Sequence, residues 1–592
     1  MFRETDRQVS LFGSQSRLSK AARNLLDKSW APGFRKEILP LLMQSERDFA
    51  KLYSDSGRPN FSVGRMLGIC LLQEMQNLTD QEALNSYSFD IRWHYALCVD
   101  EDSDYLSRRS LVEFRRRLVQ TDPQMKMMQQ IFEQVSNDAI EKLGVSINEQ
   151  RVDSTLITSN IRTKGLVDLL RKTLDNFCNC LDEQNKALLP KKITTWLDET
   201  KDGWFAAGDK NQRREKKLQL CKWLYQVKQI YKDVDEVKNT EAYLLVVRVL
   251  NEHCEVVENS QQQSQTDDKD SGATKTPNHT DSDVEPQIRM HKPRHPGLSL
   301  QSPYDPDAGC GHKGPGYHLH VVETCNNQDN PEIITGYKLF SAGRSDKGKG
   351  LDIVQLLIQS GRGPNTIFMD AGYPTANTIR PMVELGIELM APVHRVDMPK
   401  EKMGRDSFTF DCSGFITQCP AGHRPIRYAN RMTRYYGRQT HAVFDGATCR
   451  TCSLFARCPV APPNNGRKGS FRIDLDPGLR LRDEMFARQQ DDQWWDRYSI
   501  RSGVEATMSE LKRHHGIGRL RVRRMPRVHL AVICKLTACN IKRWLRAVVV
   551  GSFLAIVTAF CSSISLIRGL WMKIGIWFGF FVPYGLRSTY IG

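Results

Sequence analysis

The chain has 592 residues, enough for about three or four domains, each with its own core. Its 84 Lys and Arg against 68 Asp and Glu give a formal charge of +16, which favours a polyanionic partner: nucleic acid first, an anionic membrane surface second. The 16 cysteines do not resemble a disulfide framework, and the N-terminus lacks the apolar run of a secretory signal. We therefore expect a reducing cytoplasm, where clustered cysteines indicate metal or redox chemistry.

Residues 1–145 predict a helical domain, because apolar residues recur at helical spacing with basic residues between them. One interpretation is a plain helical bundle. The other is a helical DNA-binding domain, in which Arg115, Arg116 and Arg117 contact phosphates.

Residues 145–158 are rich in β-branched side chains and predict a strand that contains Asp153. Taken alone, an aspartate in a strand is most often a turn or cap residue. Residues 163–258 return to a helical apolar pattern and predict a helical insertion into a larger domain. Residues 259–296 hold few apolar residues, and we expect a disordered linker there.

Residues 297–400 predict a mixed sheet flanked by helices. Two β-rich runs, 317–325 and 333–342, are joined by a turn, and helix then alternates with strand as far as residue 393. Asp370 ends the strand TIFMD, immediately before a turn. The ends of strands in open α/β sheets are where ligands usually bind.

Residues 401–470 interrupt this α/β alternation and contain clustered cysteines. Cys419, Cys449, Cys452 and Cys458 include a Cys-x2-Cys pair and could hold a tetrahedral Zn²⁺, with His423 or Cys412 as substitute ligands. One alternative is a redox Cys-x-x-Cys, which we would expect beside a βαβ unit that is not apparent here. The other alternative is chance clustering of ordinary cysteines.

Residues 494–514 predict a helix on which four functional side chains share one face. At about 100° per residue, Tyr498, Arg501, Glu505 and Lys512 fall within an arc of roughly 60°. The plain alternative is a solvated face, in which Arg501 and Glu505 form a pair that contributes only a few tenths of a kcal/mol.

An arginine-rich run follows this helix and includes Arg519, Arg521 and Arg523. It predicts a surface for the phosphate backbone of nucleic acid, with a solvated basic loop as the alternative. A closing helix then ends near residue 545, and 546–592 form an apolar C-terminal extension. Its length would suffice for a membrane span. We interpret it instead as an appended segment, because it follows a finished domain.

Asp153, Asp370 and Glu505, in that order, resemble the acidic triad of DDE transposases. The pattern Tyr498-x2-Arg501-x3-Glu505-x6-Lys512 is similar to the signature of one large group of bacterial insertion-sequence transposases. The DAGY turn after Asp370 and the run HHGIGRLRVRR are also similar to that group, and the likeness covers roughly residues 30–545. The long segment after Asp153 and the apolar tail depart from the family pattern.

The resemblance implies an RNase H-like catalytic domain built from residues 146–162, 297–400 and 471–545. In that fold Asp153, Asp370 and Glu505 would hold two Mg²⁺ ions, which Mn²⁺ can replace. Arg501 and Lys512 would grip DNA phosphates beside the cut, and Tyr498 would position the terminal strand.

The implied partner is double-stranded DNA, at the terminal inverted repeats of an insertion sequence and at a target site. A homo-oligomer on DNA and a cytoplasmic, nucleoid-associated protein follow from the same resemblance, and a membrane partner does not. Two other functions stay open at this point: a non-catalytic DNA-binding protein derived from a transposase, and a nuclease of the same fold that does not join strands.

Overall fold

The computed structural model describes residues 1–5, 17–99, 105–161, 165–199, 209–257, 287–328, 330–344, 347–394, 402–411, 414–433, 437–460, 471–475 and 477–549. Most of the predicted linker (259–286), Cys412 and the apolar tail from residue 550 lie outside these ranges. Within them, no helix combines the length and hydrophobicity that crossing a membrane requires.

The N-terminal region is helical, as predicted. Its elements are α1 (Lys20–Asp27), α2 (Ala31–Gly33), the π-helix η2 (Phe34–Ile38), α3 (Leu39–Gln44), the 3-10 helix η3 (Ser45–Leu52), α4 (Val63–Gln76), α5 (Asp80–Phe89), α6 (Ile91–Leu97), α7 (Arg108–Thr121) and α8 (Lys126–Leu143).

The three arginines of α7 do not form the open phosphate-binding row that the sequence suggested. Arg115 lies among α4, α5 and α7, where its guanidinium contacts Asp80 at 2.7 Å and also binds Gln73. Arg116 and Arg117 both pair with Glu113 on the same helix, at 2.6 and 2.9 Å. All three arginines are therefore paired with acids within the protein, Arg116 and Arg117 sharing the single carboxylate of Glu113.

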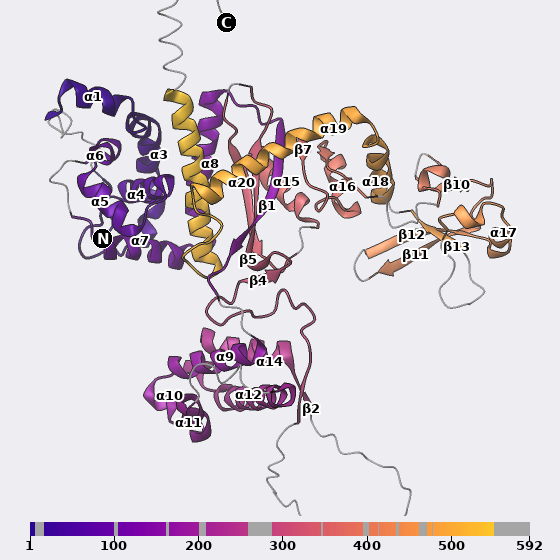
Figure 1. Cartoon of the computed structure of the whole chain (residues 1–592), viewed down its shortest axis with the longest axis horizontal. Helices are drawn as coiled ribbons and strands as arrows, with labels where there is room; N and C mark the ends of the chain where they lie inside the picture. The colour runs from indigo at the N-terminus through magenta and orange to yellow at the C-terminus, as the bar shows by residue number, and fades with distance from the viewer. Residues whose placement is uncertain are drawn as a thin grey trace, which may run out of the picture.

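The described residues form a six-stranded mixed sheet at the centre of the molecule (Figure 1). Strand β1 (Glu149–Thr158) pairs antiparallel with β5 (Gly314–Thr324) and parallel with β7 (Thr366–Phe368). The remaining strands are β4 (Gly309–Gly311) and β6 (Ile334–Ser341), both antiparallel to β5, and β8 (Glu388–Met390), parallel to β7. The predicted hairpin and the predicted strand–helix alternation are thus confirmed.

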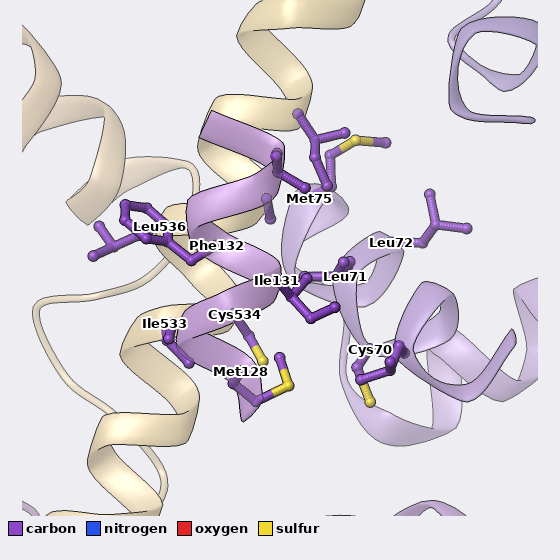
Figure 2. Packing of buried hydrophobic residues seen from close by; sticks show 14 of the residues in the cluster. Cys70, Leu71, Leu72, Met75, Met128, Ile131, Phe132, Ile533, Cys534 and Leu536 are labelled. Atoms are coloured by element: carbon purple, nitrogen blue, oxygen red, sulfur yellow. The ribbon is translucent and has the colours of Figure 1, made fainter. Parts of the chain in front are cut away.

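Helices cover both faces of this sheet. On one face α15 (Lys349–Gln359) and α16 (Ala376–Glu384) pack over Val152 and Ile367. On the other face lie α8 and a long helix, residues 525–549, whose buried side chains meet in one core (Figure 2). Met128, Ile131 and Phe132 of α8 belong to the same cluster as Ile533 and Leu536. The N-terminal helices and the closing helix therefore fold as one unit with the sheet.

The helical insertion has its own core. It comprises α9 (Leu166–Cys180), α10 (Glu183–Lys186), α11 (Lys191–Glu199), α12 (Lys210–Tyr231), α13 (Asp235–Lys238), α14 (Glu241–His253) and the strand pair β2 (Cys254–Val257) and β3 (Gln287–Met290). Strand β3 falls inside the range predicted as a linker. Ile288 and Met290 pack against the insertion core, which explains why the chain is ordered there.

The Cys-rich segment forms two small sheets beside α18 (Pro477–Arg488) (Figure 1). Its elements are η4 (Arg405–Ser407), β9 (Thr409–Phe410), β10 (Ile416–Gln418), β11 (Arg427–Thr433), β12 (Gly437–Phe444), α17 (Gly446–Arg450), η5 (Phe455–Arg457) and β13 (Phe471–Asp474). Strands β11, β12 and β13 pair antiparallel, and β9 pairs with β10.

Candidate active site

Asp153 lies on β1, and Asp370 follows the C-terminal end of the neighbouring parallel strand β7 by two residues. The β1–β7 ladder ends with the pair Arg151 and Phe368, and two residues farther along each segment Asp153 and Asp370 are close enough for their charges to interact. Burial raises the pKa of Asp153, and the charge of Asp370 raises it further, against the lowering effect of Arg501. Two carboxylates in this position repel each other unless a cation stands between them.

The segment predicted as one helix over residues 494–514 is broken. It consists of α19 (Asp492–Tyr498), the 3-10 helix η6 (Ser499–Gly503) and α20 (Val504–Arg513). The guanidinium of Arg151 donates a hydrogen bond of 2.9 Å to the carbonyl of Ile500, which would otherwise serve the α-helical ladder. The Val504 N–H instead donates to the carbonyls of Arg501 and Ser502. The prediction of one continuous helix over residues 494–514 is therefore wrong at residues 499–503.

Despite the break, Arg501 joins two of the predicted acids. Its guanidinium donates to Oδ1 of Asp153 at 2.8 Å and lies 3.8 Å from Oε1 of Glu505. The Glu505 side chain is 70% exposed, whereas that of Asp153 is 19% exposed. The arrangement leaves Glu505 open to solvent on the rim of the site, with Asp153 at its base.

Tyr498 faces the other aspartate. Its hydroxyl donates a hydrogen bond of 3.1 Å to the carbonyl of Met369, next to Asp370, and its ring stacks on Trp494. Burial raises the pKa of Tyr498 to about 12, so the phenol stays protonated at neutral pH. The structure thus brings together four of the predicted residues, Asp153, Asp370, Tyr498 and Arg501, and places Glu505 at their edge.

A buried charge network holds α20 against the sheet, and the sequence analysis did not identify it. Glu323 of β5, with no exposed side-chain surface, pairs with Arg151 at 2.7 Å and with Arg543 at 3.1 Å. Thr507 of α20 donates to the same carboxylate at 2.5 Å, and Arg543 also pairs with Glu510 at 2.9 Å. A glutamate that directly follows the apolar pair Val321-Val322 of a predicted strand was the available signal, since buried charges need partners.

Of the remaining predicted DNA-binding residues, Lys512 lies in the last turn of α20 and the three arginines lie in the segment that follows it. Lys512, Arg519 and Arg521 are exposed. Arg523 is half-buried and donates to the carbonyl of Asn160 at 3.0 Å, and Arg519 reaches the side chain of Asn160 at 3.4 Å. Arg519 and Arg523 therefore both contact Asn160, whereas Arg521 lies close enough to Glu82 for its charge to act on that carboxyl.

Cys419, Cys449, Cys452 and Cys458 line one small cavity together with His423. Burial raises the pKa of Cys449 to about 11, and the other three cysteines raise it as well, which reflects their proximity. The backbone N–H of His423 donates to the sulfur of Cys419 at 3.3 Å. Among the described residues, the four sulfurs are not all within 4.8 Å of one another, so a metal ion would have to draw them together.

The three acids fit a magnesium site by the chemistry of their donors. All three offer carboxylate oxygens, which Mg²⁺ prefers, and Asp153 and Asp370 are close enough for their charges to interact. Arg501 pairs directly with Asp153, and the charge of Lys313 also acts on it.

Two family models match parts of the chain. The model described as Transposase DDE domain matches residues 418–545, and the model described as Transposase domain (DUF772) matches residues 34–117. The first includes Arg501 and Glu505 but neither Asp153 nor Asp370. No curated protein and no solved structure gives a match. Each model spans less than half of the chain, and together they support an insertion-sequence transposase.

Proposed function

We propose that this chain is a DDE transposase, of the group with the Tyr-x2-Arg-x3-Glu-x6-Lys signature, that cuts the ends of an insertion sequence and joins them to target DNA. The observation that carries the proposal is the proximity of Asp153 on β1 to Asp370 just after the parallel strand β7, with Arg501 reaching from Asp153 to Glu505. The sheet, with three antiparallel pairings (β1–β5, β4–β5 and β5–β6) and two parallel ones (β1–β7 and β7–β8), supports an RNase H-like catalytic domain.

Asp153, Asp370 and Glu505 are the proposed ligands of the divalent ions. Bound Mg²⁺ or Mn²⁺ would activate the attacking oxygen and stabilise the charge on the leaving oxygen. The chain's own contribution is to fix the carboxylates: Asp153 on strand β1, Asp370 directly after strand β7, and Glu505 on α20, which contacts Glu323 and Arg543. This rigidity preserves the spacing that phosphoryl transfer needs.

Basic side chains around the acids are the proposed DNA contacts. Tyr498, with its protonated hydroxyl, would position the terminal strand beside Asp370. Arg501 and Lys512 would contact phosphates next to the cut, and Arg519, Arg521 and Arg523 would bind the backbone farther along the duplex. Cutting two ends of one element in a concerted reaction favours a homo-oligomer on DNA.

The Cys-rich segment is the proposed site of a structural Zn²⁺. Its support is the shared cavity of Cys419, Cys449, Cys452 and Cys458 and the N–H···S hydrogen bond to Cys419. A metal ion would compensate for the small size of the sheets in this segment, which have little core of their own. If this assignment is right, replacing Cys449 and Cys452 by serine lowers both the zinc content and the melting temperature.

The test is a cleavage and joining assay on a plasmid that carries the DNA flanking the gene on both sides. Asp153→Asn, Asp370→Asn and Glu505→Gln should each lower the Mg²⁺-dependent nicking rate by at least about 10³-fold. Binding of the same DNA should change little, because these residues carry no positive charge. If any one variant nicks at the full rate, that residue does not belong to the catalytic site. If the unmodified protein nicks DNA but does not join strands, it is a nuclease and not a transposase.

A further inference from the structure

A second group of potential metal ligands lies on the side of α20 opposite Glu505. Glu510 of α20, His515 in the turn that follows and Cys539 of the helix 525–549 each place a ligand atom within 4.8 Å of the other two. His515 and Cys539 have no exposed surface, and Glu510 is half-buried. This group is separate from the four cysteines of the Cys-rich segment and from the acidic site on β1 and β7.

The imidazole of His515 is in the state that metal binding requires. Its Nδ1 lies 3.0 Å from the carbonyl of Glu74 at the end of α4, an acceptor that requires the proton on Nδ1. The lone pair is then on Nε2, which is buried and has no hydrogen-bond partner. A histidine that ligates a metal commonly donates its other N–H to a backbone carbonyl in this way. An unsatisfied buried nitrogen is otherwise costly.

The other two residues also keep an atom available. Both hydrogen bonds from Arg543 go to Oε2 of Glu510, at 2.9 and 3.1 Å, which leaves Oε1 for another partner. The thiol of Cys539 is in hydrogen-bonding contact with Glu510, and burial raises its pKa to about 12. The charge of Arg543 is balanced by Glu323 as well as by Glu510, so a cation beside Glu510 does not face an unpaired guanidinium.

We propose that Glu510, His515 and Cys539 bind a structural Zn²⁺ through one oxygen, one nitrogen and one sulfur. Binding exchanges a proton for the metal: the S–H bond of Cys539 breaks, the thiolate takes up Zn²⁺ and the proton leaves to solvent. Ligand atoms of a tetrahedral zinc lie roughly 3.5 Å apart, so side-chain movements of about 1 Å close the site. Water would take the fourth position.

The ion would clamp three separate parts of the chain. Glu510 lies on the helix that carries Glu505, Cys539 lies on the closing helix, and His515 is bonded to α4 of the N-terminal region. The role inferred is therefore structural, and it does not depend on whether the chain cuts DNA. Zinc content, rather than activity, is the readout.

The experiment uses the full chain carrying Cys449→Ser and Cys452→Ser, which removes the Cys-rich segment as a competing zinc site. Metal analysis after dialysis should find about one zinc per chain in this background. Adding Cys539→Ser or His515→Gln should abolish it. Cys534→Ser is the matched control, because Cys534 is also buried on helix 525–549 but outside the cluster, and this variant should keep its zinc. A background chain without zinc, or a Cys539→Ser chain that retains it, would overturn the proposal.

A spectroscopic titration keeps the test valid if Cys539→Ser fails to fold. Adding Co²⁺ to the dialysed background chain, treated with chelator beforehand, should produce a thiolate-to-cobalt charge-transfer absorption and release about one proton per ion bound. Prior saturation with Zn²⁺ should suppress the absorption. If Co²⁺ binds without a charge-transfer band, no thiolate takes part and the assignment of Cys539 is wrong.

Discussion

The two faces of α20 differ in how their charged side chains are paired and exposed. Toward the sheet, Thr507 donates to the fully buried Glu323 and accepts a hydrogen bond from Arg543, which also pairs with the half-buried Glu510. Toward solvent, Glu505 is 70% exposed and its nearest cation, Arg501, stands 3.8 Å away.

This difference separates residues that fix a position from residues that remain available. A buried charge must be paired, because an unpaired one costs several kcal/mol. The exposed carboxylate of Glu505, by contrast, is open to an ion or a substrate group that arrives from solvent. The same short helix therefore has one face fixed against the sheet and one face that carries the proposed metal ligand Glu505. Substitutions on the two faces should have different consequences for stability and activity.

Removing Glu323 from the buried charge network should have the largest effect on stability. Glu323→Ala leaves the guanidinium groups of Arg151 and Arg543 buried without their shared partner, and we expect a loss of about 3–5 kcal/mol in the free energy of unfolding. Urea denaturation measures it. Glu505→Gln on the exposed face is the control and should change stability by less than about 0.5 kcal/mol. Equal losses in the two variants would mean that the two faces do not differ as described.

A substitution in η6, where the helix is interrupted before α20, should have a smaller effect on stability. A Cβ on Gly503 would collide with the guanidinium of Arg151, so Gly503→Ala should destabilise the chain by about 1–3 kcal/mol. It should also slow nicking, because Arg501 and Glu505 flank this residue. Gly165→Ala is the control: nothing lies within 4 Å of a Cβ there, and because Gly165 is the N-cap of α9 a loss of at most about 1 kcal/mol, with no effect on nicking, is expected. A neutral Gly503→Ala would show that the close approach of Arg151 is not needed.

The buried side of the sheet should also respond to pH. Burial lowers the pKa of His529 to about 4, against the opposing charge of Asp122, and its Nε2 lies 2.8 Å from the hydroxyl of Tyr337. Between about pH 4 and the ordinary pKa of 6.5, the unfolded chain binds more protons at this residue than the folded chain. Stability should therefore fall by about 1–2 kcal/mol from pH 7 to pH 5. His529→Gln should reduce that slope, and an unchanged slope would contradict the assignment.

The smallest effect is expected at the surface. Arg521 is exposed beyond α20, and Arg521→Ala should weaken DNA binding by only a few fold. The slope of the logarithm of the binding constant against the logarithm of salt concentration should fall by about one, the value for one lost phosphate contact. Arg116→Ala, where the arginine is already paired with Glu113, should leave both quantities nearly unchanged. Titrations at several salt concentrations measure the difference. A larger effect of Arg116→Ala than of Arg521→Ala would mean that DNA binds along α7 and not along the segment after α20.

Local patterns in the sequence were sufficient for much of this architecture. The β-branched run around Asp153, the hairpin of β5 and β6 and the strand that ends before Asp370 were all predicted, because their apolar spacing depends on nearby residues alone. The break at Ser499–Gly503 was not, since it depends on Arg151 from a distant strand. The inward turn of Arg115 and the meeting of His515 with Cys539 are likewise contacts between segments far apart in the chain.

The most direct test of the central claim is an exchange of metal preference at Asp370. A thiolate binds Mg²⁺ poorly and softer ions better, so Asp370→Cys should lose nicking in Mg²⁺ by at least about 10²-fold and recover a large part of it in Mn²⁺. Ser502→Cys, on the exposed side of η6, is the control and should show no such exchange. Full activity of Asp370→Cys in Mg²⁺, with no dependence on the ion supplied, would contradict a metal site formed by Asp153, Asp370 and Glu505.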